Sequence, residues 1–181
     1  VDLLVEYGDL LVWNLVLGNE RDEVLNDLLT DKGTANLISF SDAGAHIQNM
    51  AFYNFPLRLL KMANDKVTRG EADMSIEFAV HKLTGELADW FGIDAGYIKE
   101  GKRADITILD PGGLDQPLDA YHEAPMEGFD GLDRMVNRND DLVSHVFVNG
   151  KLAYDGERFD DGFGKDAGYG QFLPSRLNGG V

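Results

Sequence analysis

The chain contains no cysteine, which excludes disulfide bonds and thiolate metal sites. It has no apolar run long enough to cross a membrane, and its first residues do not resemble a signal peptide. Cations are also scarce, with 16 Lys and Arg against 32 Asp and Glu, a formal charge of -16. Because nucleic-acid binding needs cationic contacts to phosphate, we expect no nucleic-acid partner. These absences predict a soluble, cytoplasmic protein without a membrane partner.

The 181 residues are enough for one domain with a hydrophobic core. The acid excess fits a well-solvated surface better than adaptation to a salty medium or a cationic partner. The chain begins with Val1 and enters an apolar stretch at once. We therefore expect it to be a fragment of a longer protein.

The chain is organised around the hexapeptide Ser41-Asp42-Ala43-Gly44-Ala45-His46. An apolar run at 36–40 precedes it and predicts a short buried strand. Gly44 permits a tight turn directly after the strand. Because parallel α/β barrels keep their catalytic side chains at the carboxyl ends of strands, Asp42 is a candidate catalytic residue. An Asp-Gly turn with an incidental histidine remains the alternative.

Helical signals flank this hexapeptide. A helix is expected from a cap at Asn19 to a stop at Gly33, and another from Pro56, interrupted at 64–66. Ser75 caps a single longer helix that ends at Gly92. Its apolar face consists of residues at spacings of three and four, namely Ile76, Val80, Leu83, Leu87 and Phe91.

The second half of the chain has a β character. Short apolar runs at 96–98, 104–109, 143–148 and 151–154 predict strands, and Asn149-Gly150 predicts a hairpin turn between the last two. Residues 112–141 read as one long loop, and the tail from 160 to 181 as irregular.

Five stretches of the sequence follow one another in a recognisable order. They are Ser41–His46, His81–Ala88, Phe91–Ile93, Gly96–Pro111 and Val146–Lys151. In this order they resemble the C-terminal third of the amidohydrolase superfamily, and within it they are most similar to the branch of N-acyl-D-amino-acid deacylases (D-aminoacylases). The fourth stretch has the pattern Gly-x-Ile-x-x-Gly-x-x-Ala-Asp, which is very specific to the superfamily.

The resemblance implies an α/β part followed by a β part. Residues 1–92 would form the last strand and helices of a (β/α)8 TIM-type barrel, and 93–181 the C-terminal strands of a composite β-sandwich. It also implies hydrolysis of C–N (amide) bonds in an N-acyl amino acid or related amide, with one or two divalent ions, usually zinc. Asp42 matches the acid/base aspartate and a possible metal ligand, and His46 a substrate-binding histidine. A metal lowers the pKa of bound water to about 7, and a carboxylate can then take its proton and deliver it to the leaving nitrogen.

Most of the family's metal ligands have no counterpart here. A complete barrel needs about 250 residues. The chain has four histidines, and no two have the spacing of a ligand pair; His81, His122 and His145 are expected to be surface or structural residues. A catalytic zinc site needs three protein ligands, and Asp42 with His46 supplies at most two. We therefore expect the chain to be inactive alone, and to associate as a homo-oligomer or with a missing N-terminal part.

Three other interpretations stay open. One is a non-catalytic, oligomerising module derived from an amidohydrolase. Another is a fragment of a dihydroorotase- or hydantoinase-like enzyme, which the residues at 43–46 disfavour. A plain β-sandwich binding protein would leave the helix at 75–91 unexplained. The aromatic residues after His46, which are Phe52, Tyr53 and Phe55, suit an acyl pocket or, more commonly, a core.

Overall fold

The computed structural model describes residues 2–8, 21–32, 36–38, 54–115, 118, 120, 122–125, 130–131, 133–136 and 142–176. The chain divides into two compact units, Val1–Asn36 and Leu37–Val181. Among the described helices, none combines the length and the apolar character that a membrane span requires. The proposed boundary between 92 and 93 and the cytoplasmic location stay predictions.

The first unit contains two helices, α1 (Asp2–Tyr7) and α2 (Asp22–Thr30). The helix predicted between Asn19 and Gly33 is confirmed, but both predicted ends are wrong. Arg21 occupies the N-cap position without a side-chain cap bond, and Asp31 occupies the C-cap position. Two carboxylates in the first turn suit the positive end of the helix dipole instead. The apolar side chains of Val24 and Leu28 are exposed.

The second unit begins at Leu37. A strand was expected at 36–40, but residues 36–38 lie in no strand, and the rest of that range falls outside the described residues. Helix α3 (Phe55–Thr68) has Pro56 in its first turn, as predicted. It continues through 64–66, so the predicted interruption there is wrong. Two of the three polar residues that suggested a break form ion pairs, Asp65 with Lys61 at 2.6 Å and Lys66 with residues that follow the helix.

Helices α4 (Ile76–Leu83) and α5 (Gly85–Phe91) replace the single helix that was expected. The predicted ends are confirmed: the Ser75 hydroxyl accepts a hydrogen bond from the Phe78 N–H at 3.1 Å, and Gly92 ends α5 with φ +65°. The break lies at Thr84, whose φ and ψ are -129° and -84°. Gly96 packs against this break with φ +78°, and a Cβ there would lie 2.7 Å from the Thr84 carbonyl oxygen.

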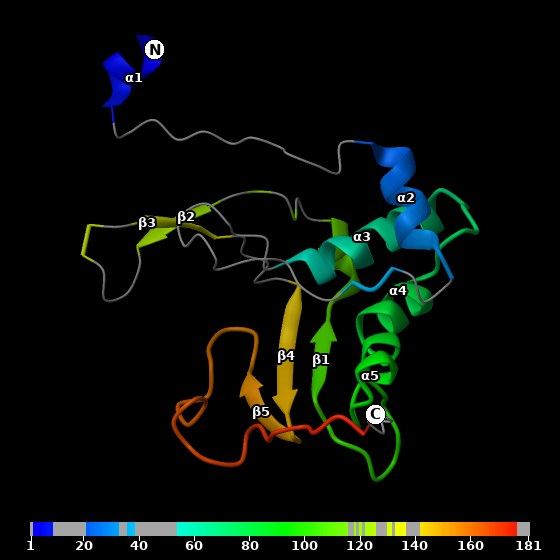
Figure 1. Cartoon of the computed structure of the whole chain (residues 1–181). Coiled ribbons are helices and arrows are strands. Elements are labelled where there is room, and N and C mark those ends of the chain that lie inside the picture. Colours follow the sequence, from blue (N-terminus) through cyan, green and yellow to red (C-terminus); the bar gives the residue numbers. More distant parts are fainter. Residues whose placement is uncertain are drawn as a thin grey trace, which may run out of the picture. The chain divides into compact units, whose positions relative to one another are not determined.

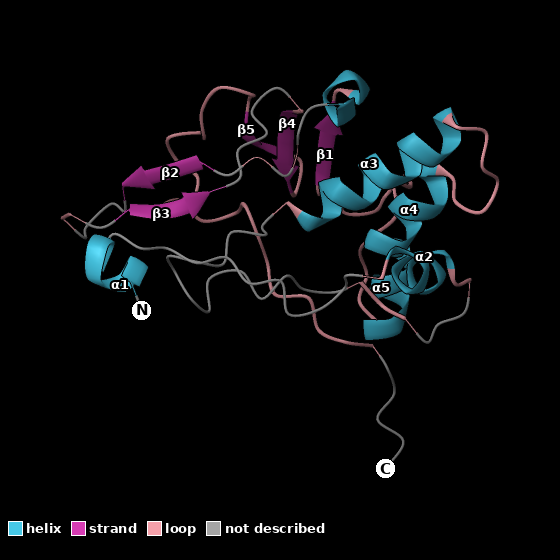
Figure 2. Cartoon of the chain, turned by 90° about the horizontal axis from the view of Figure 1, so that it is seen from above, coloured by secondary structure: helices cyan, strands magenta, loops and turns pink. Residues whose placement is uncertain are grey.

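The buried face of α4 and α5 is not the face that the apolar spacing predicted. Val80 and Phe91 are exposed, at 43% and 44%. The buried positions carry small residues and one lysine instead, namely Ala79, Lys82, Gly85 and Ala88. Small side chains let α4 pack closely against α3 on one side and α5 on the other, as seen in Figure 2.

Replacing Ser75 with alanine should lower the free energy of unfolding by about 1 kcal/mol, because the N-cap acceptor for the Phe78 N–H is lost. Urea unfolding followed by circular dichroism measures the change. Ser75→Asn keeps a capping oxygen and is the matched control, with stability expected near that of the wild type. Equal loss in both variants would show that the cap is not the cause.

Strands β1 (Ile106–Leu109), β4 (Val143–Val148) and β5 (Lys151–Tyr154) form an antiparallel sheet in the order β1-β4-β5 (Figure 1). All three strands were predicted, whereas the apolar run at 96–98 forms no strand. The turn at Asn149-Gly150 is also confirmed, with positive φ at both residues (53° and 78°), as a type I′ turn requires. The Asn149 N–H donates to the Asp105 carboxylate at 2.6 Å and the Gly150 N–H to the Ala104 carbonyl at 2.8 Å. The Ala-Asp pair of the superfamily stretch therefore fixes this turn.

The segment predicted as one long loop contains regular structure. A 3-10 helix, η2, spans Pro111–Asp115, and strands β2 (His122–Pro125) and β3 (Asp133–Val136) pair as an antiparallel hairpin. These two strands were not predicted because they are short and polar, contain few β-branched residues and show no alternation of apolar and polar residues. The irregular tail is confirmed for residues 160–176, which hold neither helix nor strand.

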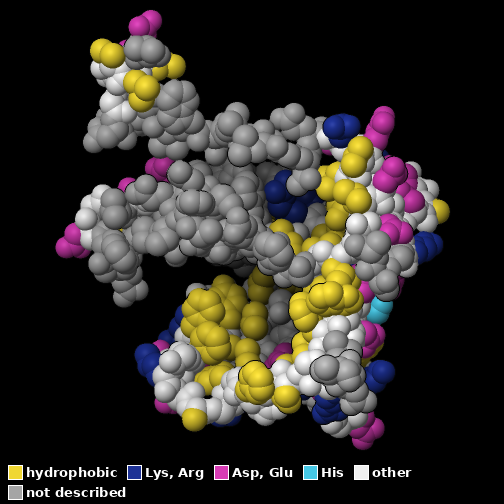
Figure 3. All heavy atoms as spheres, in the orientation of Figure 1, with side chains coloured by type: hydrophobic (Ala, Val, Ile, Leu, Met, Phe, Trp, Pro, Cys, Tyr) yellow, Lys and Arg dark blue, Asp and Glu magenta, His cyan; other side chains and the backbone are white. Residues whose placement is uncertain are grey.

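The core of the second unit lies where α3, α4 and η2 meet, and it includes Leu59, Leu60, Ala63, Met74 and Leu114. The Gly113 position is so close to β4 that a Cβ there would lie 2.9 Å from the Leu142 Cα. Many other large apolar side chains are exposed, and hydrophobic atoms gather over the sheet in Figure 3. Exposed examples are Trp90, Ile98, Ile108, Phe159 and Phe172.

Candidate functional site

Both predicted site residues, Asp42 and His46, lie outside the described residues, as does the possible metal ligation by Asp42. Of the three aromatic residues considered for an acyl pocket, only Phe55 is described, and it opens α3 in a half-buried position. The roles of Asp42 and His46 therefore stay predictions. The described structure begins again at Asn54, eight residues after His46.

Asn54 anchors the chain directly before α3. Its side chain is buried, and its Nδ2 donates to the Leu118 carbonyl oxygen at 2.5 Å. Leu118 is itself 1% exposed, and α3 contacts η2 nearby. Because a buried amide hydrogen bond has no competing water, Asn54 fixes the start of α3 to the core.

Lys82 is the largest fully buried side chain among the described residues, and it carries a charge. Its Nζ lies 3.3 Å and 3.2 Å from the two carboxylate oxygens of Glu86, whose side chain is 13% exposed. The Phe78 ring centroid lies 5.5 Å from the same Nζ. The ion pair joins the end of α4 to the start of α5 across the break at Thr84. A buried charge pair has either a structural or a functional role.

A second buried lysine, Lys66, closes the connection between α3 and α4. Its Nζ contacts Asp73 at 2.7 Å and Glu71 at 3.1 Å, and Glu71 also accepts from the Arg69 Nε at 2.6 Å. The hydrogen bond that Lys66 donates to Asp73 is the main reason why the pKa of Lys66 is raised. Burial opposes this rise, and the hydrogen bond to Glu71 adds to it. The Arg69 hydrogen bond, followed by that of Lys66, holds the pKa of Glu71 below its usual 4.5.

Glu71→Gln should destabilise the chain near neutral pH but not in acid. A carboxyl group with a lowered pKa contributes stability above its unfolded pKa of 4.5, and loses it as the pH falls through the folded value. The gap in urea midpoint between wild type and variant should thus close as the pH falls below the unfolded pKa of 4.5 and through the lower, folded one. Adding 1 M NaCl at pH 7 is the control, because it screens exposed ion pairs and should narrow the gap too. A gap independent of pH would contradict the assignment.

The histidines outside the hexapeptide do not form a common site where they are described. His81 is exposed on α4, with its ring 6.4 Å from that of Tyr97, while His145 pairs with Ile108 inside the sheet. His122 lies in β2. Within the described ranges, no group of three or more His, Asp or Glu side chains could hold a metal ion. The described residues thus do not form a metal site, and zinc stays a prediction.

Neither Lys66 nor Lys82 stood out in the sequence as a functional or core residue. Lys66 sits in a polar run that resembles a helix end, and its partners Glu71 and Asp73 come after the helix. Lys82 does leave one signal, since it falls three residues after Ala79 and three before Gly85, on the row of small buried residues.

Residues 13–153 match the sequence profile of the amidohydrolase family. This chain belongs to the amidohydrolase family. The match covers the predicted catalytic hexapeptide, the helices α3 to α5 and the sheet, so the superfamily resemblance is confirmed. Amidohydrolases are generally metal-dependent hydrolases with a fold related to the TIM barrel.

Individual relatives of this amidohydrolase differ in their named activities. An uncharacterized protein of Mycobacterium tuberculosis is 46% identical over 178 residues, which are 96% of this chain and 29% of that protein. An N-acyl-D-aspartate deacylase of Alcaligenes xylosoxydans xylosoxydans is 30% identical over 93 residues, 51% of this chain and 16% of that protein. A dihydroorotase of Sulfolobus acidocaldarius is 37% identical over 86 residues, 46% of this chain and 20% of that protein.

The chain therefore spans less than a third of the length of the curated relatives it matches. No solved structure matches this amidohydrolase chain significantly. The deacylase and dihydroorotase relatives support the family, while the deacylase-like branch stays a prediction.

Proposed function

We propose that this chain is the C-terminal part of a hydrolase that cleaves the amide bond of N-acyl amino acids. The observation that carries the proposal is the family match over residues 13–153, which includes Asp42 and His46. The similarity to an N-acyl-D-aspartate deacylase supports the acyl amino acid as substrate class.

In the proposed reaction Asp42 is the acid/base residue. A divalent ion such as zinc, when bound in a hydrolase of this family, supplies an acidified water. The Asp42 carboxylate would accept a proton from the attacking water as the water oxygen bonds to the acyl carbon, and would return it to the nitrogen as the C–N bond breaks, while His46 would contact the substrate. Asp42 and His46 provide at most two ligands, and three are needed, so the remaining ligands come from outside this sequence. The 181-residue chain alone is accordingly inactive in this proposal.

A second candidate is hydrolysis of a cyclic amide. The specific observation in its favour is the 37% identity to a dihydroorotase over 86 residues. A non-catalytic module that acts through self-association is the remaining alternative, and the exposed apolar side chains on α5 and the sheet suit it.

The test uses a chimera in which this chain replaces the matched 178 residues of the mycobacterial relative. Its zinc content is measured by elemental analysis after purification without chelator, and its mass by light scattering. It is then assayed on N-acetyl-D-aspartate, N-acetyl-L-aspartate and dihydroorotate. The isolated chain is assayed in parallel as the control for activity without the remaining ligands.

Each outcome separates the candidates. Hydrolysis of N-acetyl-D-aspartate by the chimera, but not by the isolated chain, would support the proposal. Turnover of dihydroorotate instead would favour the cyclic-amide alternative. A chimera with stoichiometric zinc that hydrolyses none of the three would contradict the proposal, and an isolated chain of defined oligomeric mass would then favour the module.

A further inference from the structure

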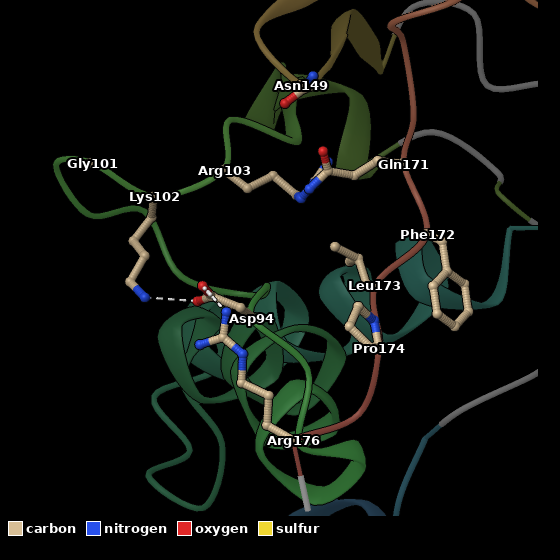
Figure 4. Close-up of a pocket in the computed structure, with 10 residues that line it drawn as sticks. All are labelled: Asp94, Gly101, Lys102, Arg103, Asn149, Gln171, Phe172, Leu173, Pro174 and Arg176. Carbon is tan, nitrogen blue, oxygen red and sulfur yellow. Dashed lines mark hydrogen bonds and ion pairs between the residues drawn. The ribbon is translucent and has the colours of Figure 1, made fainter.

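A cleft of about 350 Å³ opens in the second unit beside the sheet. Three segments far apart in the sequence form it: the loop after α5, the β4–β5 turn and the C-terminal stretch 171–176 (Figure 4). The charged residues that line it are three cations and one carboxylate, which are Lys102, Arg103, Arg176 and Asp94. This cation excess stands out in a chain whose formal charge is -16.

Asp94 already engages two of these cations. Its carboxylate accepts from the Lys102 Nζ at 2.7 Å and from the Arg176 Nη2 at 3.1 Å. The hydrogen bond from Lys102 is the main reason why the pKa of Asp94 lies below its ordinary value. Lys102, Asp94 and Arg176 thus form a chain of charges along one side of the cleft, as Figure 4 shows.

Arg103 differs from the other two cations. Its side chain is only 9% exposed, yet its Nη1 lies 3.6 Å from the Asp105 carboxylate, beyond hydrogen-bond distance. Among the described residues the guanidinium donates no hydrogen bond, and Figure 4 shows it directed into the cleft. A guanidinium carries five N–H donors. None of the Arg103 nitrogens is among the buried, unpartnered atoms of the described residues, so these donors reach the solvent of the cleft and are available to an acceptor there.

The neutral residues of the cleft add donors around this guanidinium. Asn149 belongs to the tight turn after β4 and is held there by its backbone, so its side-chain amide remains available to the cleft. Gln171 contributes a second amide from the opposite wall. Cations combined with amide donors form a surrounding suited to an oxyanion, because each such group donates hydrogen bonds to oxygen.

We propose that this cleft binds a small oxyanion, a carboxylate- or phosphate-bearing molecule, with Arg103 as its principal ligand. The planar guanidinium fork matches two oxygens of such a group. Lys102 and Arg176 supply the positive field, since both already face the cleft through Asp94. This binding is independent of the proposed amide hydrolysis.

The test is a titration of the full 181-residue chain followed by amide and guanidinium NMR shifts. Inorganic phosphate and succinate serve as separate probes in low-salt buffer that contains no other oxyanion. We expect saturable shifts at Lys102, Asn149, Gln171 and the Arg103 Nε–H. Whichever probe binds more tightly identifies the phosphate or the carboxylate as the preferred source of the oxygens.

Arg103→Gln should weaken binding about tenfold or more, because charge-assisted hydrogen bonds are lost. Arg158→Gln is the matched control, since it makes the same charge change at an 80% exposed side chain outside the cleft lining, and should leave affinity within about twofold. Absence of saturable shifts with both probes, or equal affinity in Arg103→Gln and the wild type, would overturn the proposal. If Arg103→Gln does not give a folded spectrum, Arg103→Lys is tested instead. Lysine keeps the positive charge but lacks the planar guanidinium fork, so this variant should also bind the oxyanion more weakly than the wild type. Wild-type affinity in Arg103→Lys would overturn the proposal.

Discussion

Lys82→Ala is expected to lower the free energy of unfolding by about 3–5 kcal/mol. The substitution removes a fully buried ammonium group and leaves the Glu86 carboxylate, 13% exposed, without its partner 3.2 Å away. A buried charge that loses its counter-ion keeps its full desolvation cost. Removing the aliphatic stem also leaves a cavity between α4 and α5. Urea unfolding at pH 7 measures the effect.

Two variants show whether burial, rather than the ion pair as such, sets the size of this loss. Lys61→Ala breaks the Lys61–Asp65 pair, which has the same i,i+4 spacing and a shorter distance of 2.6 Å but 29% and 37% exposed side chains. It should cost less than about 1 kcal/mol. Lys82→Met with Glu86→Leu removes both charges and should recover most of the stability. A Lys82→Ala loss as small as that of Lys61→Ala would contradict the argument.

Asp42→Asn is expected to reduce kcat of the active chimera by about 10²–10⁴-fold. Asparagine has nearly the same shape as aspartate but cannot accept a proton from water at neutral pH. Because the lost interaction concerns proton transfer, kcat should fall while KM changes little. Steady-state assays on the hydrolysed substrate measure both constants.

Zinc analysis of the same variant separates the two roles assigned to Asp42. Unchanged zinc with low kcat indicates an acid/base residue, and reduced zinc indicates that Asp42 also ligates the metal. Asp130→Asn, an equal charge change at an exposed residue, is the control and should leave kcat unaltered. Wild-type kcat in Asp42→Asn would remove Asp42 from the proposed mechanism.

Local signals in the sequence predicted the elements whose cause is local. The hydroxyl of Ser75, the left-handed Gly92 and the Asn149-Gly150 turn each act within a few residues, and each was predicted correctly. The break at Thr84 was missed because the apolar spacing continues through it, whereas the cause is the approach of Gly96 from further along the chain.

Buried charges escaped prediction for the same physical reason. Nothing near Arg103 in the sequence indicates that the C-terminal stretch 171–176 covers it, and Lys66 becomes a core residue only when Glu71 and Asp73 fold back. Asp42 and His46 were found through a family pattern rather than through packing, and their roles depend on residues outside the described ranges.

The C-terminal stretch also completes the end of α5. The Ser175 hydroxyl donates to the Phe91 carbonyl at 2.7 Å, and the Arg176 N–H donates to the Gly92 carbonyl at 2.6 Å. Helix α5 has only 7 residues, too few to persist without tertiary contacts. During synthesis on the ribosome, the hydrogen-bond partners of these two carbonyl groups are therefore added more than 80 residues after the end of α5.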